Sequence, residues 1–95
     1  MTRVVRSKRP GWRFERNFPD EKFSYWERHV GCGIALIVDQ MSARRFRSWA
    51  VDACGDQIKG TFSGRNPTFE AACAQLVGKT SRILMMAIRQ VEASR

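Results

Sequence analysis

The sequence predicts an α+β domain in which an antiparallel sheet of three to five strands is packed by one long C-terminal helix. Short segments with alternating or continuous apolar residues occupy positions 12–62, as is typical of β-strands. Turn-forming Gly, Pro, Asn and Asp residues separate these segments. From Thr68 to Val91 the apolar residues recur at helical spacing, which predicts a helix at the end of the chain.

Length and composition favour one domain in the cytoplasm. A chain of 95 residues with 43% hydrophobic content is large enough for a single core. We expect residues 1–11 to form a flexible basic arm and residues 12–95 to form the domain. The longest apolar run, Ile34 to Val38, is too short to span a bilayer, and the basic N-terminus is not followed by an apolar signal core. We therefore expect no membrane contact.

The three cysteines indicate reduced, partly buried thiols. Cys32, Cys54 and Cys73 lie about 20 residues apart, outside any Cys-x-x-Cys or Cys/His cluster. Such wide spacing and an odd number favour neither zinc nor a disulfide framework, although one disulfide with a leftover thiol stays open. The sequence predicts no metal and no cofactor.

Aromatic residues dominate the first third of the domain. Six of them fall between Trp12 and Trp26, where alternation predicts a short strand beginning at Trp12 and a second strand from Phe23 to Val30. We favour these rings as core material, because large side chains in a small domain are mostly buried. The alternative is a surface platform on which bases stack, flanked by Arg13, Arg16, Lys22 and Arg28.

The middle of the chain predicts a central strand and a hairpin. Ile34 to Val38 is apolar throughout, which suits a strand covered on both faces. A strand from Phe46 and another over Ile58–Phe62 are expected on either side of a turn at Cys54-Gly55-Asp56, with Ser63–Pro67 as a loop. In this interpretation Trp49, Val51, Ile58 and Phe62 pack against the helix residues Phe69, Cys73 and Leu76.

The predicted helix is longer than the sheet can cover. Asn66 or Thr68 is the expected N-cap, and about 25 helical residues would extend close to 37 Å. Gly78 allows either a kink or a break. The C-terminal turns need another contact, and Met85 or Met86 beside Ile88 suits a partner protein or a homodimer as well as packing against the aromatic segment.

The charge balance favours an acidic partner. Lys and Arg total 17 against 9 Asp and Glu, so that the formal net charge is +8. The compact cluster Arg44-Arg45-Phe46-Arg47 suits phosphate contact combined with stacking. A solvated arm and a solvated hairpin end are the alternatives. The candidate residues for binding nucleic acid or a partner are Arg3, Arg6, Lys8, Arg9, Arg13, Arg44, Arg45, Phe46, Arg47, Lys59 and Arg65.

Several short motifs of this sequence resemble those of a known family. The alternation of Trp49 and Val51, the run Gly60-Thr61-Phe62, and Thr68-x-Glu70-Ala71-Ala72 at the helix start are similar to AP2 and integrase N-terminal DNA-binding domains. The resemblance covers about half the chain and implies a three-stranded sheet that enters the DNA major groove. It would place Arg44, Arg45, Arg47, Lys59 and Trp49 at the nucleic acid. In general appearance the chain also resembles small phage and mobile-element proteins, anti-CRISPR inhibitors among them.

Two functions are therefore expected, neither of them enzymatic. The first is a nucleic-acid-binding module, with DNA favoured over RNA as the ligand. The second is a phage or mobile-element protein that inhibits a host complex by binding its acidic or nucleic-acid-binding surface. His29, Asp39, Asp52 and Asp56 are the obvious acid/base candidates, and their spacing assembles no catalytic dyad or triad.

Overall fold

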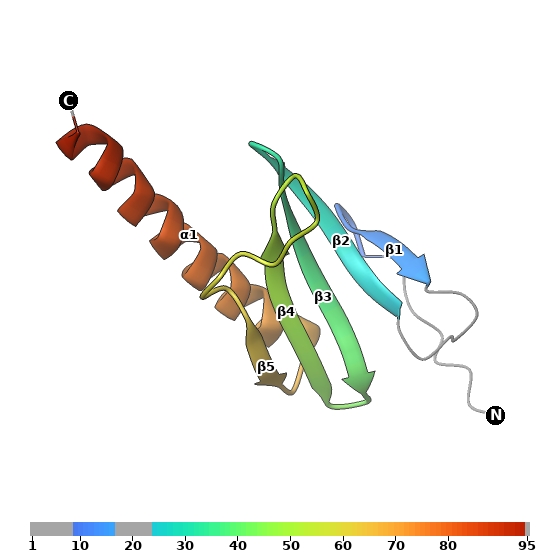
Figure 1. Ribbon diagram of the computed structural model, residues 1–95. Helices are drawn as coiled ribbons and strands as arrows, with labels where there is room; N and C mark the ends of the chain where they lie inside the picture. The colour runs from blue at the N-terminus through green and yellow to red at the C-terminus, as the bar shows by residue number, and fades with distance from the viewer. Residues whose placement is uncertain (1–8, 17–23, 95) are drawn as a thin grey trace.

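A computed structural model describes residues 9–16 and 24–94 of the chain. Five antiparallel strands form one sheet in the order β1-β2-β3-β4-β5, and a single helix lies across one face of it (Figure 1). The predicted α+β class, with a sheet packed by one long C-terminal helix, is thus confirmed. The elements are β1 (Arg13–Arg16), β2 (Ser24–Gly31), β3 (Ile34–Ser42), β4 (Arg45–Val51), β5 (Ser63–Asn66) and α1 (Phe69–Ala93).

The core lies between the helix and the sheet and is built largely of aromatic rings. Trp26 on β2 is 2% exposed. Its ring centroid lies 5.4 Å from that of Phe14, 6.4 Å from that of Phe46 and 5.2 Å from that of Phe69. The interpretation of the aromatic segment as core material is confirmed for Trp26, and Trp12 and Phe14 pack partly buried against the same cluster. Phe18 and Phe23 lie outside the described residues.

β3 is the central strand, as its continuous apolar run predicts. It pairs with β2 on one side and β4 on the other, and residues 35–39 are all buried. A strand that is covered on both faces has apolar side chains on both of them. On the face opposite α1, Ala35 and Ile37 are only 3% and 6% exposed, although none of the described helical residues lies over them.

The predicted inward face of β4 is wrong. Phe46, Ser48 and Ala50 face α1, whereas Trp49 and Val51 point to the opposite side of the sheet. The helix approaches this strand closely, because Ser48 Oγ donates a hydrogen bond of 3.0 Å to the carbonyl of Ala72. Only small residues fit at such a contact, so the large ring of Trp49 is displaced to the other face.

The last strand of the sheet also differs from the prediction. Residues 52–62 form a loop, and β5 comes from the Ser63–Asn66 segment that was expected to be a loop. The loop satisfies the edge of β4 with a side chain, since Thr61 Oγ1 accepts a hydrogen bond from the Ala50 amide and donates one to the Ile58 carbonyl. Gly60, at φ +88°, turns the chain away from a strand conformation. Ile58 packs against the core as expected, while Phe62 is 45% exposed.

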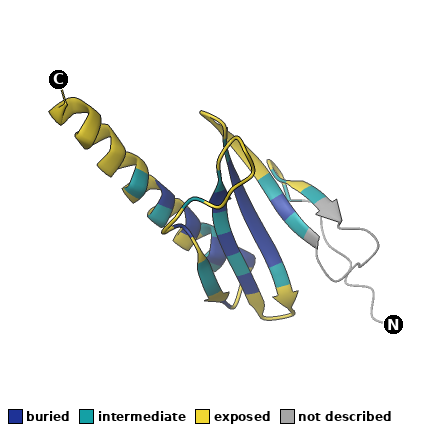
Figure 2. Cartoon of the chain, in the orientation of Figure 1, coloured by how far each residue is buried: buried dark blue, intermediate teal, exposed yellow. Residues whose placement is uncertain are grey.

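α1 runs without interruption through Gly78 and extends beyond the sheet. Thr68 is the N-cap, with its hydroxyl accepting a hydrogen bond of 3.1 Å from the Ala71 amide. The buried helical residues are Phe69, Ala72, Leu76 and Thr80, and burial ends where the sheet ends (Figure 2). The molecule is accordingly elongated, with extents of 58 × 24 × 22 Å.

All three cysteines lie among the described residues and are free. Cys73 is half-buried on α1, as expected of a thiol packed against the core. Cys32 and Cys54 are exposed, which corrects the expectation of burial for these two, because each lies in a turn beyond the end of a strand. Burial raises the pKa of the Cys73 thiol to about 11, and the nearby Glu70 carboxylate adds to the rise.

Candidate nucleic-acid interface

Three arginines from two separate segments meet at one end of the sheet. Arg44 comes from the turn between β3 and β4, Arg45 is the first residue of β4, and Arg65 comes from β5. Together with Asn66 and Pro67 they line a shallow hollow of about 370 Å³. We refer to Arg44, Arg45 and Arg65 as the arginine end. The sequence singled out all three residues without indicating that they lie together.

Pairing of β5 with β4 creates the arginine end. β4 and β5 are antiparallel and Phe46 is the register partner of Asn66, so Arg45 and Arg65 lie diagonally on either side of that pair. The Asn66 side chain secures this register, because its Nδ2 donates a hydrogen bond of 3.2 Å to the Phe46 carbonyl. Asn66, one of the two expected helix caps, therefore fixes the strand edge.

Within the described residues, the arginine end carries positive charge without an acidic partner. All three side chains are exposed, and the described residues that line the hollow include no carboxylate. None of the three forms an ion pair within residues 9–16 and 24–94. Guanidinium groups gathered without acidic partners provide several donors for a phosphate or carboxylate oxygen.

Arg47 differs from its neighbours in the cluster. Its guanidinium donates from Nε and Nη2 to Oδ2 of Asp39, its register partner on β3, and Asp39 is buried. The same guanidinium lies 5.8 Å from the ring centroid of Trp49. Arg47 thus links β4 to β3 through its ion pair with Asp39, and this pair partly neutralises its charge.

Arg9 and Phe46 both take part in packing within the domain. The Arg9 guanidinium stacks 3.9 Å from the Phe69 ring centroid and pairs at 3.1 Å with Glu70, which ties the end of the arm to α1. Phe46 is buried in the core, so that its ring cannot receive a base, which corrects the expected stacking role.

The other predicted residues do not join the arginine end. Lys59 is exposed in the loop that leaves the opposite end of β4 (Figure 1). Arg13 is exposed on β1, at the far edge of the sheet. Arg3, Arg6 and Lys8 lie outside the described residues.

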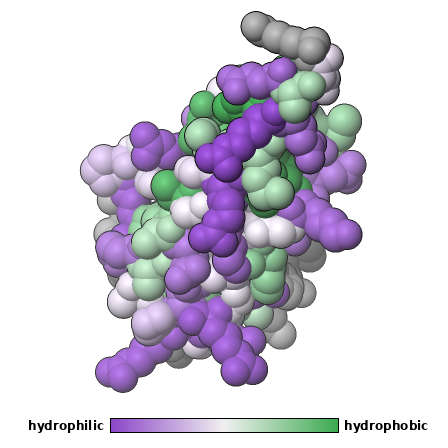
Figure 3. Space-filling model, turned by 90° about the vertical axis from the view of Figure 1, so that its left-hand side faces the viewer, coloured by the Kyte–Doolittle hydropathy of each residue, from purple (hydrophilic) through white to green (hydrophobic). Residues whose placement is uncertain are grey.

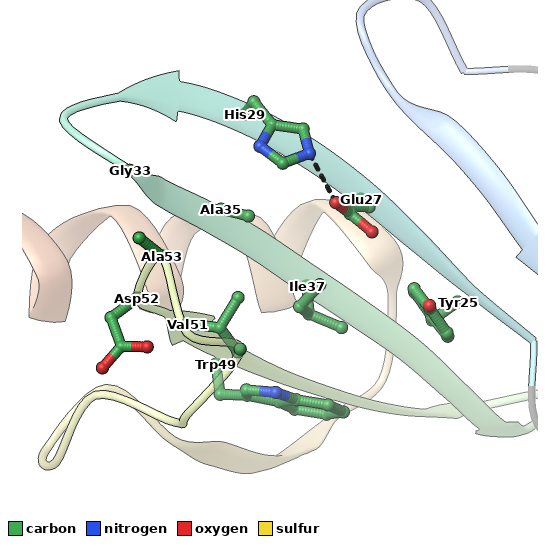
Figure 4. A pocket seen from close by; sticks show the side chains of 11 residues that line it. Tyr25, Glu27, His29, Gly33, Ala35, Ile37, Trp49, Val51, Asp52 and Ala53 are labelled. Atoms are coloured by element: carbon green, nitrogen blue, oxygen red, sulfur yellow. Dashed lines mark ion pairs between the residues drawn. The ribbon is translucent and has the colours of Figure 1, made fainter.

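The sheet face opposite α1 carries a second hollow that the sequence did not single out. It has a volume of about 600 Å³ and a floor of Ala35, Ile37 and Val51. Trp49 and Tyr25 flank this floor, and the close-up shows them projecting from the same side of the sheet (Figure 4). The signal that could have revealed this face is the alternation of Arg47, Trp49 and Val51 along β4.

Among the acid/base candidates, Asp39 pairs with Arg47, and His29 and Asp52 contact neighbouring groups. His29 Nε2 lies 2.6 Å from Glu27 Oε1 at the rim of the larger hollow (Figure 4). Asp52 Oδ1 accepts hydrogen bonds of 3.0 Å from the amides of Cys54 and Asp56 and so shapes the loop.

In the described part of the chain, no group of three His, Cys, Asp or Glu residues is arranged to hold a metal ion. The same residues contain no helix that is long and apolar enough to cross a membrane.

Fold and site together define a small α+β domain with a cationic sheet end. Comparisons with protein-family models, with curated proteins and with solved structures gave no match. The resemblance to AP2 and integrase domains therefore stays a prediction, and the functional argument rests on the geometry of this chain.

Proposed function

We propose that this protein is a nucleic-acid-binding module that contacts phosphates through the arginine end. The supporting observation is the convergence of Arg44, Arg45 and Arg65 around one hollow with no carboxylate among its described lining residues. A charge of +8 would add long-range attraction toward a polyanion. Phosphate contacts of this kind supply affinity and position the protein without selecting a sequence.

The test is a salt titration of binding to labelled DNA and RNA, compared between two variants that lose the same charge. Arg44→Ala/Arg45→Ala removes two arginines from the arginine end, and Arg82→Ala/Arg89→Ala removes two exposed arginines from α1. We expect the first variant to bind at least about tenfold more weakly at low salt and to lower the slope of log K against log salt by about 2. The second variant should stay close to the unmodified protein.

Equal losses in the two variants would show that only net charge matters and would overturn the assignment to the arginine end. A single pair, Arg65→Ala against Lys59→Ala, refines the result, because both residues are exposed cations in the same stretch of chain but only Arg65 lines the hollow. Failure of the unmodified protein to bind DNA or RNA at low salt would overturn the proposed function.

The exposed stripe on the C-terminal half of α1 favours a second candidate function, contact with a protein. Leu84, Ile88 and Val91 lie along this stripe and are 40–66% exposed. Apolar and hydrophilic groups share the surface seen from this side of the molecule (Figure 3). Lys79, Arg82 and Arg89 on the same segment suit an acidic surface, as in a host protein that handles nucleic acid.

This candidate predicts a partner that survives nuclease treatment and is lost in a Leu84→Ser/Ile88→Ser variant. Sedimentation of the purified protein supplies the control. A dimer that becomes a monomer in the same variant would assign the stripe to a second copy of the chain and would remove the support for a different partner.

A further inference from the structure

We propose that the sheet face opposite α1 binds unpaired nucleobases, so that the module prefers single-stranded over double-stranded nucleic acid. This inference rests on the proposed function and adds the class of nucleic acid. It begins from two aromatic rings on that face, Trp49 on β4 and Phe62 in the loop before β5. Their centroids are 6.3 Å apart and their planes are inclined by 31°, so the two rings are close neighbours on that face.

Both rings are accessible from solvent. Phe62 is 45% exposed and Trp49 is half-buried on the rim of the 600 Å³ hollow. Rings this large would be expected in the core of a small domain, yet neither contributes to the buried cluster under α1. The backbone of Phe62 is held by α1, because Lys79 Nζ donates a hydrogen bond of 2.7 Å to the Phe62 carbonyl.

The hollow beside Trp49 has the shape and lining for a flat, partly apolar group. Its floor of Ala35, Ile37 and Val51 is apolar, and Glu27 and Asp52 place carboxylates at its rim. A nucleobase combines an apolar face with N–H donors on its edge, which such acceptors can bind. A base within a duplex exposes neither its face nor its pairing edge, so only an unpaired base can occupy the hollow.

Cations lie where the backbone of such a strand would run. Arg45 and Arg47 alternate with buried residues on β4 and therefore point to the same face as Trp49. Arg45 lies about 13 Å from Trp49 along the strand, which is four residues at about 3.3 Å each. The arginine end is thus continuous with the aromatic surface along β4.

Charge limits the path to the β4–β5 half of the face. Asp39 and Glu27 lie on the β3 and β2 side of the face and disfavour phosphates there. Arg47 lies at the boundary between the acidic and the basic half of the face. Its guanidinium pairs with Asp39 on β3 and lies over the Trp49 ring on β4. The face thus combines a stacking surface with a cationic track, as proteins that bind single strands do.

The experiment compares a single-stranded oligonucleotide with a hairpin duplex of the same length by fluorescence anisotropy at low salt, with DNA and RNA arms. We expect the single strand to bind at least about tenfold more tightly. Phe62→Ala should weaken single-strand binding by about tenfold and leave duplex binding unchanged, because stacking on an aromatic ring contributes only with unpaired bases. Val77→Ala, which truncates an apolar side chain of similar exposure on α1 (53% against 45% for Phe62), is the matched control.

Tryptophan fluorescence tests the role of Trp49 without a variant that removes its aromatic ring. The single strand should quench the tryptophan emission of the unmodified protein, and Trp49→Phe should abolish most of the quenching while retaining a ring for binding. Duplex binding equal to single-strand binding, or a Phe62→Ala effect that is the same on both ligands, would overturn this inference and leave the proposed function intact. Absence of binding to either ligand would overturn both.

Discussion

The two halves of α1 carry one continuous apolar stripe but differ in what covers it. In the first half, Leu76 is fully buried against the sheet and Thr80 is the last buried residue. In the second half, Leu84 and Ile88 continue the stripe at 40% and 51% exposure. Helical periodicity is equal in the two halves, so it reports which face is apolar and says nothing about whether another element reaches that face.

The largest expected effect is a difference between two leucines on this helix. Leu76→Ala should lower the free energy of unfolding by about 3 kcal/mol, because it leaves a cavity under the sheet. Leu84→Ala should cost less than about 1 kcal/mol, since its side chain is already 40% exposed. Urea denaturation followed by circular dichroism measures both. Similar losses would mean that the second half of α1 is covered in solution, and a concentration-dependent midpoint would identify self-association.

A smaller effect is expected in the reaction rates of the thiols. The rate of Cys73 reports whether the first half of α1 is buried. At pH 8 Cys73 should react with a disulfide reagent about tenfold more slowly than exposed Cys32 and Cys54, because burial raises its pKa to about 11 and keeps the thiol protonated. Mass spectrometry of the labelled chain separates the three sites. Equal rates for all three cysteines would place Cys73 outside the packed half.

The raised pKa of Cys73 also sets the direction of a pH effect. The folded state favours the neutral thiol, so its contribution to stability is complete below the ordinary thiol pKa of 9.0 and is lost as the pH rises toward about 11. Cys73→Ser should remove most of this loss between pH 9 and 11, and Cys54→Ser, at an exposed turn, should leave it unchanged.

The smallest expected effect lies at the junction of the two halves. Gly78 is exposed within the helix, and a Cβ added there would meet no atom within 4 Å. Gly78→Ala should therefore raise the free energy of unfolding by about 0.5–1 kcal/mol, since alanine restricts the unfolded chain and favours helix. Thermal denaturation checks the sign. A loss of stability would show that the helix needs a hinge at Gly78.

Much of the fold could be predicted from the sequence, because its signals are local. Apolar periodicity predicted the helix, the continuous run at Ile34–Val38 predicted the central strand, and Thr68 was one of two expected caps. The strand that pairs with β4 was misplaced, because side-chain hydrogen bonds of Thr61 and Asn66 decide which segment extends the sheet. Such bonds join residues 11 and 20 positions apart, and no local pattern predicts them.

The candidate site divides in the same way. The sequence singled out Arg44, Arg45 and Arg65 as candidate binding residues, since charge clusters are visible in the chain itself. It also proposed Arg9 and Phe46, which the tertiary structure assigns to packing on the core. Composition does not distinguish a cation that stacks on Phe69 from one that faces solvent.

The sequence by itself determined the class of fold, the apolar face of α1 and the excess of positive charge. Only the tertiary structure decided which face of β4 meets the helix, and with it the surface that Trp49 and Phe62 present. The physical reason is close packing. Where Ala72 approaches Ser48 within hydrogen-bond distance, there is room only for small side chains, and the large ring that the pattern placed inside is left on the open face.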